Sequence, residues 1–266
     1  MSPSDRSLRG KVAVVTGAGP GIGRATALAL AADGASVVVA ARRAARLGAL
    51  ADDVARATGA RCLAVPTDIA DAASRAALVE RVAAELGRVD ALVNVAAHGG
   101  PRARVAETDW DAYLEAVRVN VVATMSLCGL AAERMRAAGT GGSIVNIGAL
   151  SSTTMLAKMA SYTTTKAAMV VASKTMAREV GPAGIRVNVV TPGFTTGAPL
   201  DAMFAQMAAR TGGDAAELSA RAAREAALHR HVDPEDVAEA VLFLASERGR
   251  GVTGVELHVN AGLWIG

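Results

Sequence analysis

Short runs of apolar, mostly β-branched residues alternate with longer alanine-rich stretches along almost the whole chain. The runs predict β-strands at residues 12–15, 36–40, 62–65, 91–95, 143–147, 185–190 and 255–259. The stretches between them predict helices at about residues 22–33, 44–58, 72–86, 107–138, 160–180 and 234–246. Near-continuous apolar strands separated by helices are typical of a parallel sheet that is covered on both faces. Because crossovers between parallel strands are right-handed, the pattern predicts an α/β fold with a Rossmann-like, doubly wound sheet of about seven strands.

No linker-like stretch or short repeat interrupts this alternation, so we interpret residues 1–266 as a single nucleotide-binding domain. The alternation of strands and helices is interrupted only at residues 194–231, which we interpret as a partly helical insertion that forms a lid over the substrate. Aromatic residues make up 3% of the chain and apolar residues 52%, so the core must consist mostly of alanine, valine, leucine and isoleucine.

Charge and composition argue against several classes of protein. The 28 basic and 25 acidic residues leave a net charge of +3 with no basic block, so nucleic acid is not an expected partner. No run approaches the roughly 18 apolar residues of a membrane span, and the first residues lack the apolar stretch of a signal peptide. Cys62 and Cys128 fit neither a disulfide framework nor a metal site. We therefore expect a cytoplasmic protein with no metal and no membrane partner.

A glycine-rich turn between the first strand and the first helix carries the strongest chemical signal. It reads Thr16-Gly17-Ala18-Gly19-Pro20-Gly21-Ile22-Gly23. Glycines at this point let the backbone turn tightly and approach a pyrophosphate, which then lies at the helix N-terminus. The glycines fall at 17, 21 and 23, and Ile22 occupies the last glycine of the commoner Gly-x-Gly-x-x-Gly pattern. In this strand–turn–helix context we expect dinucleotide binding rather than a simple tight turn.

The end of the second strand bears on the choice of cofactor. Enzymes that prefer NAD usually carry an acidic residue here, but this chain has Ala41, Arg42 and Arg43. Because a guanidinium can donate two parallel hydrogen bonds to a phosphate, we favour NADP(H) over NAD(H). The alternative is that Arg42, Arg43 and Arg46 form a solvated helix start. After the third strand, Asp68 and Ile69 are expected beside the adenine, unless Asp68 caps the helix that begins near residue 71.

Further segments match one family in their order and spacing. They are Asn94-Val95-Ala96-Ala97 after the fourth strand, Asn120 in a helix, Tyr162-Thr163-Thr164-Thr165-Lys166, Pro192-Gly193 after the sixth strand, and residues 252–262 around the last strand. With the glycine turn, they resemble the classical short-chain dehydrogenases/reductases over nearly the whole chain. The resemblance implies that Asn94, Ala96, Pro192, Gly193 and Thr195 contact the cofactor. It also implies that Asn120 holds a proton-relay water and that the protein is a homotetramer or homodimer built on helices 107–138 and 160–180.

The chemistry of the tyrosine and the lysine of this set predicts a catalytic role for the tyrosine. Tyr162 and Lys166 are four residues apart and share a helix face. A lysine cation and the positive oxidised nicotinamide would lower the phenol pKa from its ordinary value of about 10. Tyr162 would then act as acid or base toward a carbonyl or alcohol. The resemblance adds that Lys166 binds the nicotinamide ribose. The alternative is a surface tyrosine stacked over a lysine stem.

One member of the family's catalytic set is absent. Its serine, which hydrogen-bonds the substrate oxygen, normally lies 13 residues before the tyrosine, where this chain has Ala149. Ser151 and Ser152 follow at the mouth of the site, and Ser151 is the better replacement because it is nearer. Equally, both serines could merely close a turn. Loss of one donor to a developing oxyanion costs about 10² to 10³ in rate where such donors have been tested.

Substrate contacts are expected from loops beyond the carboxyl ends of the strands. The candidates are His98, Ala149, Ser151, Phe194, Met203 and Met207. Met203 and Met207 suggest an apolar lid face for a bulky or apolar small-molecule substrate, although ordinary packing is an alternative. His229 and His231 are expected at a solvated end of the lid.

Two functions remain from the sequence. The leading hypothesis is an NADP(H)-dependent oxidoreductase that reduces a ketone or oxidises a secondary alcohol, with Tyr162 as acid/base. The alternative keeps the fold and the nucleotide but has a non-redox (lyase, isomerase or cyclase) or non-catalytic role, because of Ala149.

Overall fold

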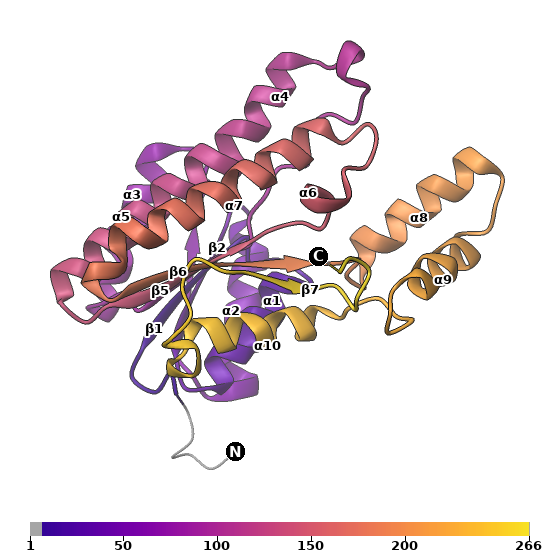
Figure 1. Ribbon diagram of the computed structural model, residues 1–266. Helices are drawn as coiled ribbons and strands as arrows, with labels where there is room; N and C mark the ends of the chain where they lie inside the picture. Colours follow the sequence, from indigo (N-terminus) through magenta and orange to yellow (C-terminus); the bar gives the residue numbers. More distant parts are fainter. Residues whose placement is uncertain (1–6, 266) are drawn as a thin grey trace.

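A seven-stranded parallel sheet forms the centre of the computed structural model, which describes residues 7–265 (Figure 1). The strands are β1 (Val12–Thr16), β2 (Ser36–Ala41), β3 (Cys62–Pro66), β4 (Ala91–Asn94), β5 (Gly142–Ile147), β6 (Ile185–Pro192) and β7 (Glu256–Val259). Their order across the sheet is β3-β2-β1-β4-β5-β6-β7. The order changes direction between β1 and β4, as in a doubly wound sheet, so the predicted Rossmann-like fold is confirmed.

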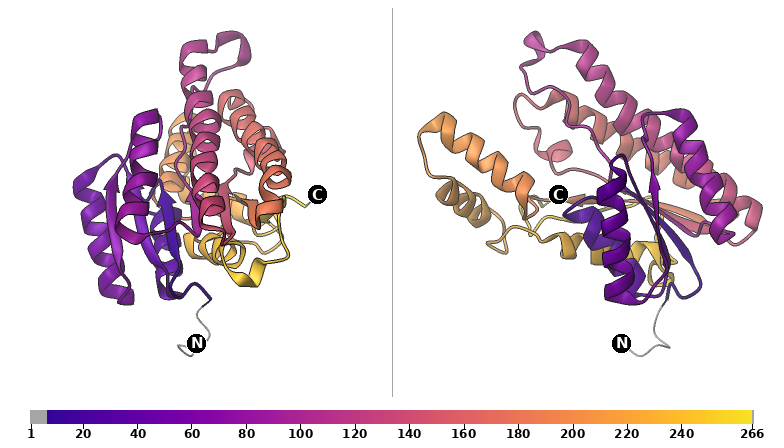
Figure 2. Two further views of the ribbon diagram at one scale, coloured as in Figure 1. Left: turned by 90° about the vertical axis from the view of Figure 1, so that its left-hand side faces the viewer. Right: turned by 180° about the vertical axis from the view of Figure 1, so that it is seen from behind.

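Helices cover both faces of the sheet (Figure 2). One face carries α1 (Ile22–Ala32), α2 (Ala44–Thr58) and α10 (Pro234–Ala245), and the other carries α3 (Ala72–Leu86), α5 (Thr124–Ala138) and α7 (Ala160–Val180). In β1, Ala13 and Val15 pack with the first group, whereas Val12 and Val14 pack with the second. Successive side chains of a strand point to opposite faces, so a strand covered on both faces must be apolar throughout.

The helix predicted at residues 107–138 is continuous but begins later. It consists of α4 (Trp110–Val117), a π-helical segment (Arg118–Ala123) and α5. Asp109 fixes its start, because the Asp109 carboxylate accepts hydrogen bonds from the backbone N–H groups of Asp111 and Ala112. By length and composition this helix could cross a membrane. Here α5 packs against the sheet as a core helix through buried side chains such as Leu127 and Met135.

The predicted insertion at residues 194–231 contains two helices, α8 (Ala198–Thr211) and α9 (Ala215–Glu225). They project from the body of the molecule beside the carboxyl ends of β6 and β7 (Figure 1). A parallel bridge between Thr195 and Val232 closes the base of the insertion. The structure adds one short helix that the sequence did not predict, α6 (Ser151–Thr154), and three 3₁₀ turns at Val105–Glu107, Gly181–Ala183 and Glu247–Gly249.

Candidate active site

A cleft of about 520 Å³ lies at the carboxyl ends of β1, β2, β3 and β4. It brings together many of the residues that the sequence assigned to the cofactor and adds several others: Gly17, Gly19, Ala40, Ala41, Arg42, Arg43, Thr67, Asp68, Ile69, Ala70, Val95, Ala96, Ala97, His98, Glu115 and Val119. The position agrees with the general rule that ligands of open α/β sheets bind where the strand order changes direction.

The glycines of the first turn are required by their geometry. Gly17 (φ +67°) and Gly21 (φ +88°) adopt left-handed backbone conformations, which favour glycine. A Cβ at Gly17 would overlap the backbone nitrogen of Ala96, and one at Gly23 would lie 2.5 Å from the Gly17 carbonyl oxygen. Helix α1 begins at Ile22 without a side-chain cap, so its N-terminus is suited to a phosphate.

The arginines after β2 are exposed and form no ion pair within residues 7–265. Arg42 and Arg43 line the cofactor cleft, and Arg43 also precedes the first residue of α2. Arg46 does not line that cleft; it lines a neighbouring groove along α2. A solvated helix start therefore describes Arg46 better than it describes Arg42 or Arg43.

Asp68 does not cap a helix, so one of the two interpretations of this residue is wrong. Asp71 caps α3, where its carboxylate accepts hydrogen bonds from Ala73 N (3.3 Å) and Ser74 N (2.9 Å). The Asp68 carboxylate accepts one from Ala70 N at 3.0 Å, which holds a tight turn on the cleft wall. Asp68 is exposed there, next to Ile69.

Tyr162 and Lys166 lie on one face of α7, as predicted. The Lys166 Nζ is 5.9 Å from the centre of the Tyr162 ring and donates a hydrogen bond to the Ile147 carbonyl oxygen at 2.7 Å. Only 4% of Lys166 is exposed, and Tyr162 is half-buried. The alternative of a surface tyrosine stacked over a solvated lysine stem is therefore wrong.

Burial shifts the two pKa values in opposite directions. It raises the pKa of the Tyr162 phenol above 10, an effect opposed in part by the positive charge of Arg102. It lowers the pKa of the Lys166 ammonium to about 8. In the protein alone, burial therefore raises the Tyr162 pKa, whereas the sequence analysis expected a lysine and a bound nicotinamide to lower it.

The buried lysine makes stability depend on pH. Because the folded-state pKa of Lys166 lies below 10.5, the unfolded chain binds more protons between pH 8 and pH 10.5, and the free energy of unfolding rises with pH there. From about pH 7.5 to about pH 10 the parent should gain about 2 kcal/mol relative to Lys166→Met, measured by urea unfolding. Lys174→Met, which removes an exposed lysine of α7, should keep the gain. An equal gain in parent and Lys166→Met would contradict the assignment.

Asn120 joins the loop after β4 to α7. Its Oδ1 accepts a hydrogen bond from the backbone N–H of His98, and its Nδ2 donates to the His98 carbonyl and to Thr165 Oγ1. The side chain is buried in the π-helical segment and all three contacts are 2.8–3.0 Å. The His98 ring is exposed and lines the cofactor cleft, so the structure places His98 nearer the expected cofactor site than a separate substrate site.

The Asn94 side chain points into a polar network below the site rather than into the cleft. Its Oδ1 accepts from Thr16 Oγ1 (3.1 Å), and its Nδ2 donates to Asn146 Oδ1 (2.8 Å). The Asn146 Nδ2 donates in turn to Ser173 Oγ at 2.9 Å, and all four residues are buried. We call this chain the amide ladder. The sequence analysis missed Asn146 and Ser173, although an asparagine inside the apolar run 143–147 is a detectable signal.

The two candidate serines differ in their contacts. The Ser152 hydroxyl donates to the Ala149 carbonyl at 2.6 Å and so closes the turn after β5. The Ser151 hydroxyl is buried and has no hydrogen-bond partner among residues 7–265. Ala149 itself is 7% exposed. Turn formation thus accounts for Ser152, whereas it does not account for the Ser151 hydroxyl.

The insertion at residues 194–231 packs through aromatic side chains rather than through its methionines. Phe194, Phe204 and His231 form a cluster with ring centres 5.8–5.9 Å apart. His231 is half-buried and its Nε2 contacts Ser219, so its expected place at a solvated lid end is wrong. Met203 is half-buried, but Met207 is 42% exposed and does not share a buried face with it. Ordinary packing describes Phe194 and Phe204.

The segment that leads into the lid is held by close backbone contacts. A Cβ at Gly193, which follows Pro192 at the end of β6, would lie 2.8 Å from the Asn260 Cα. The Thr195 hydroxyl donates to the Gly193 carbonyl at 3.1 Å. These contacts fix the chain at the carboxyl end of β6, which is where the family resemblance places Pro192, Gly193 and Thr195 beside the cofactor.

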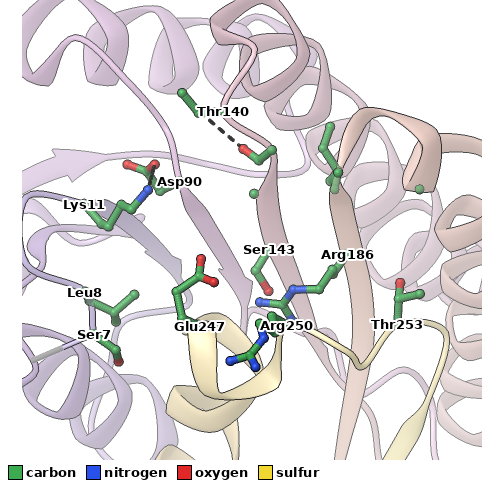
Figure 3. A pocket seen from close by; sticks show the side chains of 16 residues that line it. Ser7, Leu8, Lys11, Asp90, Thr140, Ser143, Arg186, Glu247, Arg250 and Thr253 are labelled. Atoms are coloured by element: carbon green, nitrogen blue, oxygen red, sulfur yellow. Dashed lines mark hydrogen bonds and ion pairs between the residues drawn. The ribbon is translucent and has the colours of Figure 1, made fainter. Parts of the chain in front are cut away.

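Another cavity, of about 350 Å³, opens at the amino ends of β1, β5 and β6 (Figure 3). Three of its charged groups already have protein partners: Arg186 donates to the Leu244 and Ser246 carbonyls, and Lys11 pairs with Asp90. No group of three or more His, Cys, Asp or Glu side chains within residues 7–265 is arranged to hold a metal. The candidate active site is therefore the one at the carboxyl edge.

Comparison with known proteins agrees with this site. The model of a family described as enoyl-(acyl carrier protein) reductase matches residues 17–264. The chain is 38% identical over 255 residues to cis-4-hydroxycyclohexanecarboxylate dehydrogenase of Sinomonas cyclohexanicum, which covers 95% of this chain and 96% of that protein.

Two solved structures have the same fold over nearly the full length. L-sorbose reductase from Gluconobacter frateurii, complexed with NADPH and L-sorbose, superimposes with a TM-score of 0.92 at 32% identity, covering 98% of this chain and 99% of that one. NAD+-bound xylitol dehydrogenase superimposes with a TM-score of 0.89 at 26% identity, covering 96% and 99%. The family match and these relatives show that the chain is an oxidoreductase and belongs to the short-chain dehydrogenase/reductase family.

Proposed function

We propose that the protein is an NADP(H)-dependent oxidoreductase that reduces a ketone, or oxidises the matching secondary alcohol, with Tyr162 as the acid/base. The observation that carries the proposal is the buried pair of Tyr162 and Lys166, which lies on α7 beside the loop that Asn120 fixes. A bound nicotinamide supplies or accepts the hydride. The relatives described above are dehydrogenases and reductases, so the non-redox alternative is not favoured.

The protein's own residues would handle the proton. During reduction, Tyr162 donates its phenolic proton to the carbonyl oxygen as that oxygen gains negative charge. Lys166 has a pKa of about 8 and therefore exchanges protons near neutral pH, which suits it to reprotonate Tyr162. Asn120 positions the start of this path, and the family resemblance supports a relay water near it.

The developing oxyanion needs a second donor besides Tyr162. We assign this role to Ser151, because its buried hydroxyl lacks a protein partner whereas that of Ser152 has one. Ala149, two residues earlier, has no side-chain donor. This assignment keeps the usual chemistry of the family despite the change at position 149.

The cofactor preference rests on Arg42 and Arg43. Replacing both by glutamine should raise the Kd for NADPH about 10- to 100-fold, because the two exposed guanidiniums together should contribute about 1.4–2.8 kcal/mol through charged hydrogen bonds to the 2′-phosphate. The Kd for NADH should change less than about threefold, since NADH lacks the 2′-phosphate. Fluorescence titration with both nucleotides measures this, and Arg46→Gln serves as the control because Arg46 lies outside the cleft lining. Equal weakening of both nucleotides would contradict the preference.

The lid, the assembly and the location of the protein complete the proposal. Residues 194–231 would cover a bulky or apolar carbonyl compound, and the protein would work in the cytoplasm as a homotetramer or homodimer. Exposed apolar side chains on the helices expected at the subunit interface support such an assembly: Trp110 (58% exposed), Leu114 (61%), Val122 (55%) and Val171 (64%).

The test of the function is NADPH consumption with a panel of ketones and quinones, together with NADP+ reduction by the matching alcohols. Because relatives act on a hydroxycyclohexanecarboxylate and on L-sorbose, cyclic ketones and ketoses belong in the panel. We expect turnover with at least one compound and none by Tyr162→Phe. Tight NADPH binding with no turnover across the panel would speak for the non-redox alternative.

A further inference from the structure

The loop after β4 runs over the first turn of α7. Asn120 holds it at His98 through both backbone groups of that residue. Two residues later, a Cβ on Gly100 would overlap the Ser161 hydroxyl, so the Gly100 backbone lies against the residue that precedes Tyr162. The loop is therefore fixed at two points next to the proposed acid/base.

Arg102 follows Gly100 by two residues, so their Cα atoms lie at most about 7 Å apart. Its guanidinium is exposed, and no carboxylate of residues 7–265 forms an ion pair with it. Of the charged groups, Arg102 is the one that acts on the Tyr162 phenol, and its charge opposes the rise in the phenol pKa caused by burial. Both the path of the loop and this electrostatic effect place Arg102 at the rim of the site.

The neighbouring charges leave Arg102 without a partner. Glu107 and Asp109 are the nearest acids along the chain. Glu107 is exposed and forms no ion pair with Arg102, and the Asp109 carboxylate is engaged in capping α4. Arg104 in the same loop and Lys158, four residues before Tyr162, are also exposed and positive. An unpaired guanidinium at the rim of the site attracts an anion, and its planar donor groups fit a carboxylate with two parallel hydrogen bonds.

We propose that Arg102 binds the carboxylate of the substrate, so that the protein acts on a ketone or secondary alcohol that also carries a carboxylate group. The inference rests on the proposed function and narrows it. The substrate would pair an apolar body, which suits the lid and Ala149, with an anionic end at the rim of the loop. Arg102 is then a specificity-determining residue that contacts the end of the substrate remote from the reacting carbon.

The test compares two ketones that differ only in charge, 4-oxocyclohexanecarboxylate and its neutral carboxamide. For Arg102→Gln we expect kcat/KM with the carboxylate to fall about 10- to 100-fold, mainly through KM, and that with the carboxamide to change less than about threefold. Arg102→Lys keeps the charge but not the paired donors of the guanidinium, so its kcat/KM with the carboxylate should lie between the values of the parent and of Arg102→Gln. The control Arg104→Gln removes the same charge from the same loop and should leave both ketones unaffected. Equal losses for the two ketones would mean that Arg102 only tunes Tyr162, and would overturn the proposal.

A binding measurement separates this proposal from the proposed function. Calorimetry of the protein with NADP+ would compare acetate, benzoate and cyclohexanecarboxylate with their amides. We expect the protein to bind at least one acid more tightly than the matching amide. If this preference is lost in Arg102→Gln but kept in Arg104→Gln, the carboxylate site is supported even if no ketone is reduced. Absence of any preference for the acids overturns the proposal even if neutral ketones are reduced.

Discussion

Replacing Tyr162 by phenylalanine will lower kcat for ketone reduction by about 10² to 10⁴-fold, the usual contribution of a positioned general acid. The variant loses one hydroxyl and keeps the ring that packs beside Lys166. Binding of NADPH should therefore remain within about threefold of the parent value. Steady-state kinetics and fluorescence titration of the nucleotide measure the two quantities.

The chain provides a matched control, because Tyr113 is the other of its two tyrosines. The Tyr113 hydroxyl contacts Thr164 Oγ1 at 2.5 Å on the outer side of α7. Tyr113→Phe should keep kcat within about threefold of the parent. If Tyr162→Phe keeps more than a tenth of the parent kcat, another group supplies the proton and the proposed mechanism fails.

Ser151→Ala should lower kcat about 10² to 10³-fold with little change in KM, because an oxyanion donor acts mainly on the transition state. Ser152→Ala should lower kcat far less, since the Ser152 hydroxyl already donates its hydrogen bond to the Ala149 carbonyl. The pair of variants thus separates a hydroxyl that is free from one that closes a turn. Single-turnover measurements of NADPH oxidation would compare them.

A second substitution tests whether the family's usual position can take over. In the Ser151→Ala background, Ala149→Ser should restore kcat at least about tenfold, because it returns a hydroxyl to the position that the family uses. Full activity of Ser151→Ala without this change would show that Tyr162 alone stabilises the oxyanion.

The sheet was predictable from the sequence because its signals are local. The inner strands are buried on both faces, so their apolar runs stand out without knowledge of their neighbours. The predicted starts of α2, α3 and α7 also agree with the structure. The capping role of Asp71 has the same origin, since Asp at the residue before a helix binds the first N–H groups. Asp68, three residues earlier, shows the limit of such signals, because one residue type serves both turns and caps.

The details of the site depend on contacts between distant segments. Arg102 reaches Tyr162 across 60 positions of the chain, and no pattern within the loop marks it. His231 is half-buried against Phe194 and Phe204, which lie 37 and 27 positions earlier in the chain. The short helix α6 consists of serine and threonine, which rank low as helix formers and bond their own backbone.

The amide ladder has a consequence for experiments that vary pH. Its members are two carboxamides and two hydroxyls, none of which gains or loses a proton between acid and mildly alkaline solution. The amide ladder, which joins β1, β4 and β5 to α7, thus keeps its charge unchanged while Lys166 and Tyr162 titrate. A pH–rate profile of this enzyme will accordingly contain no step from the ionisation of these four side chains.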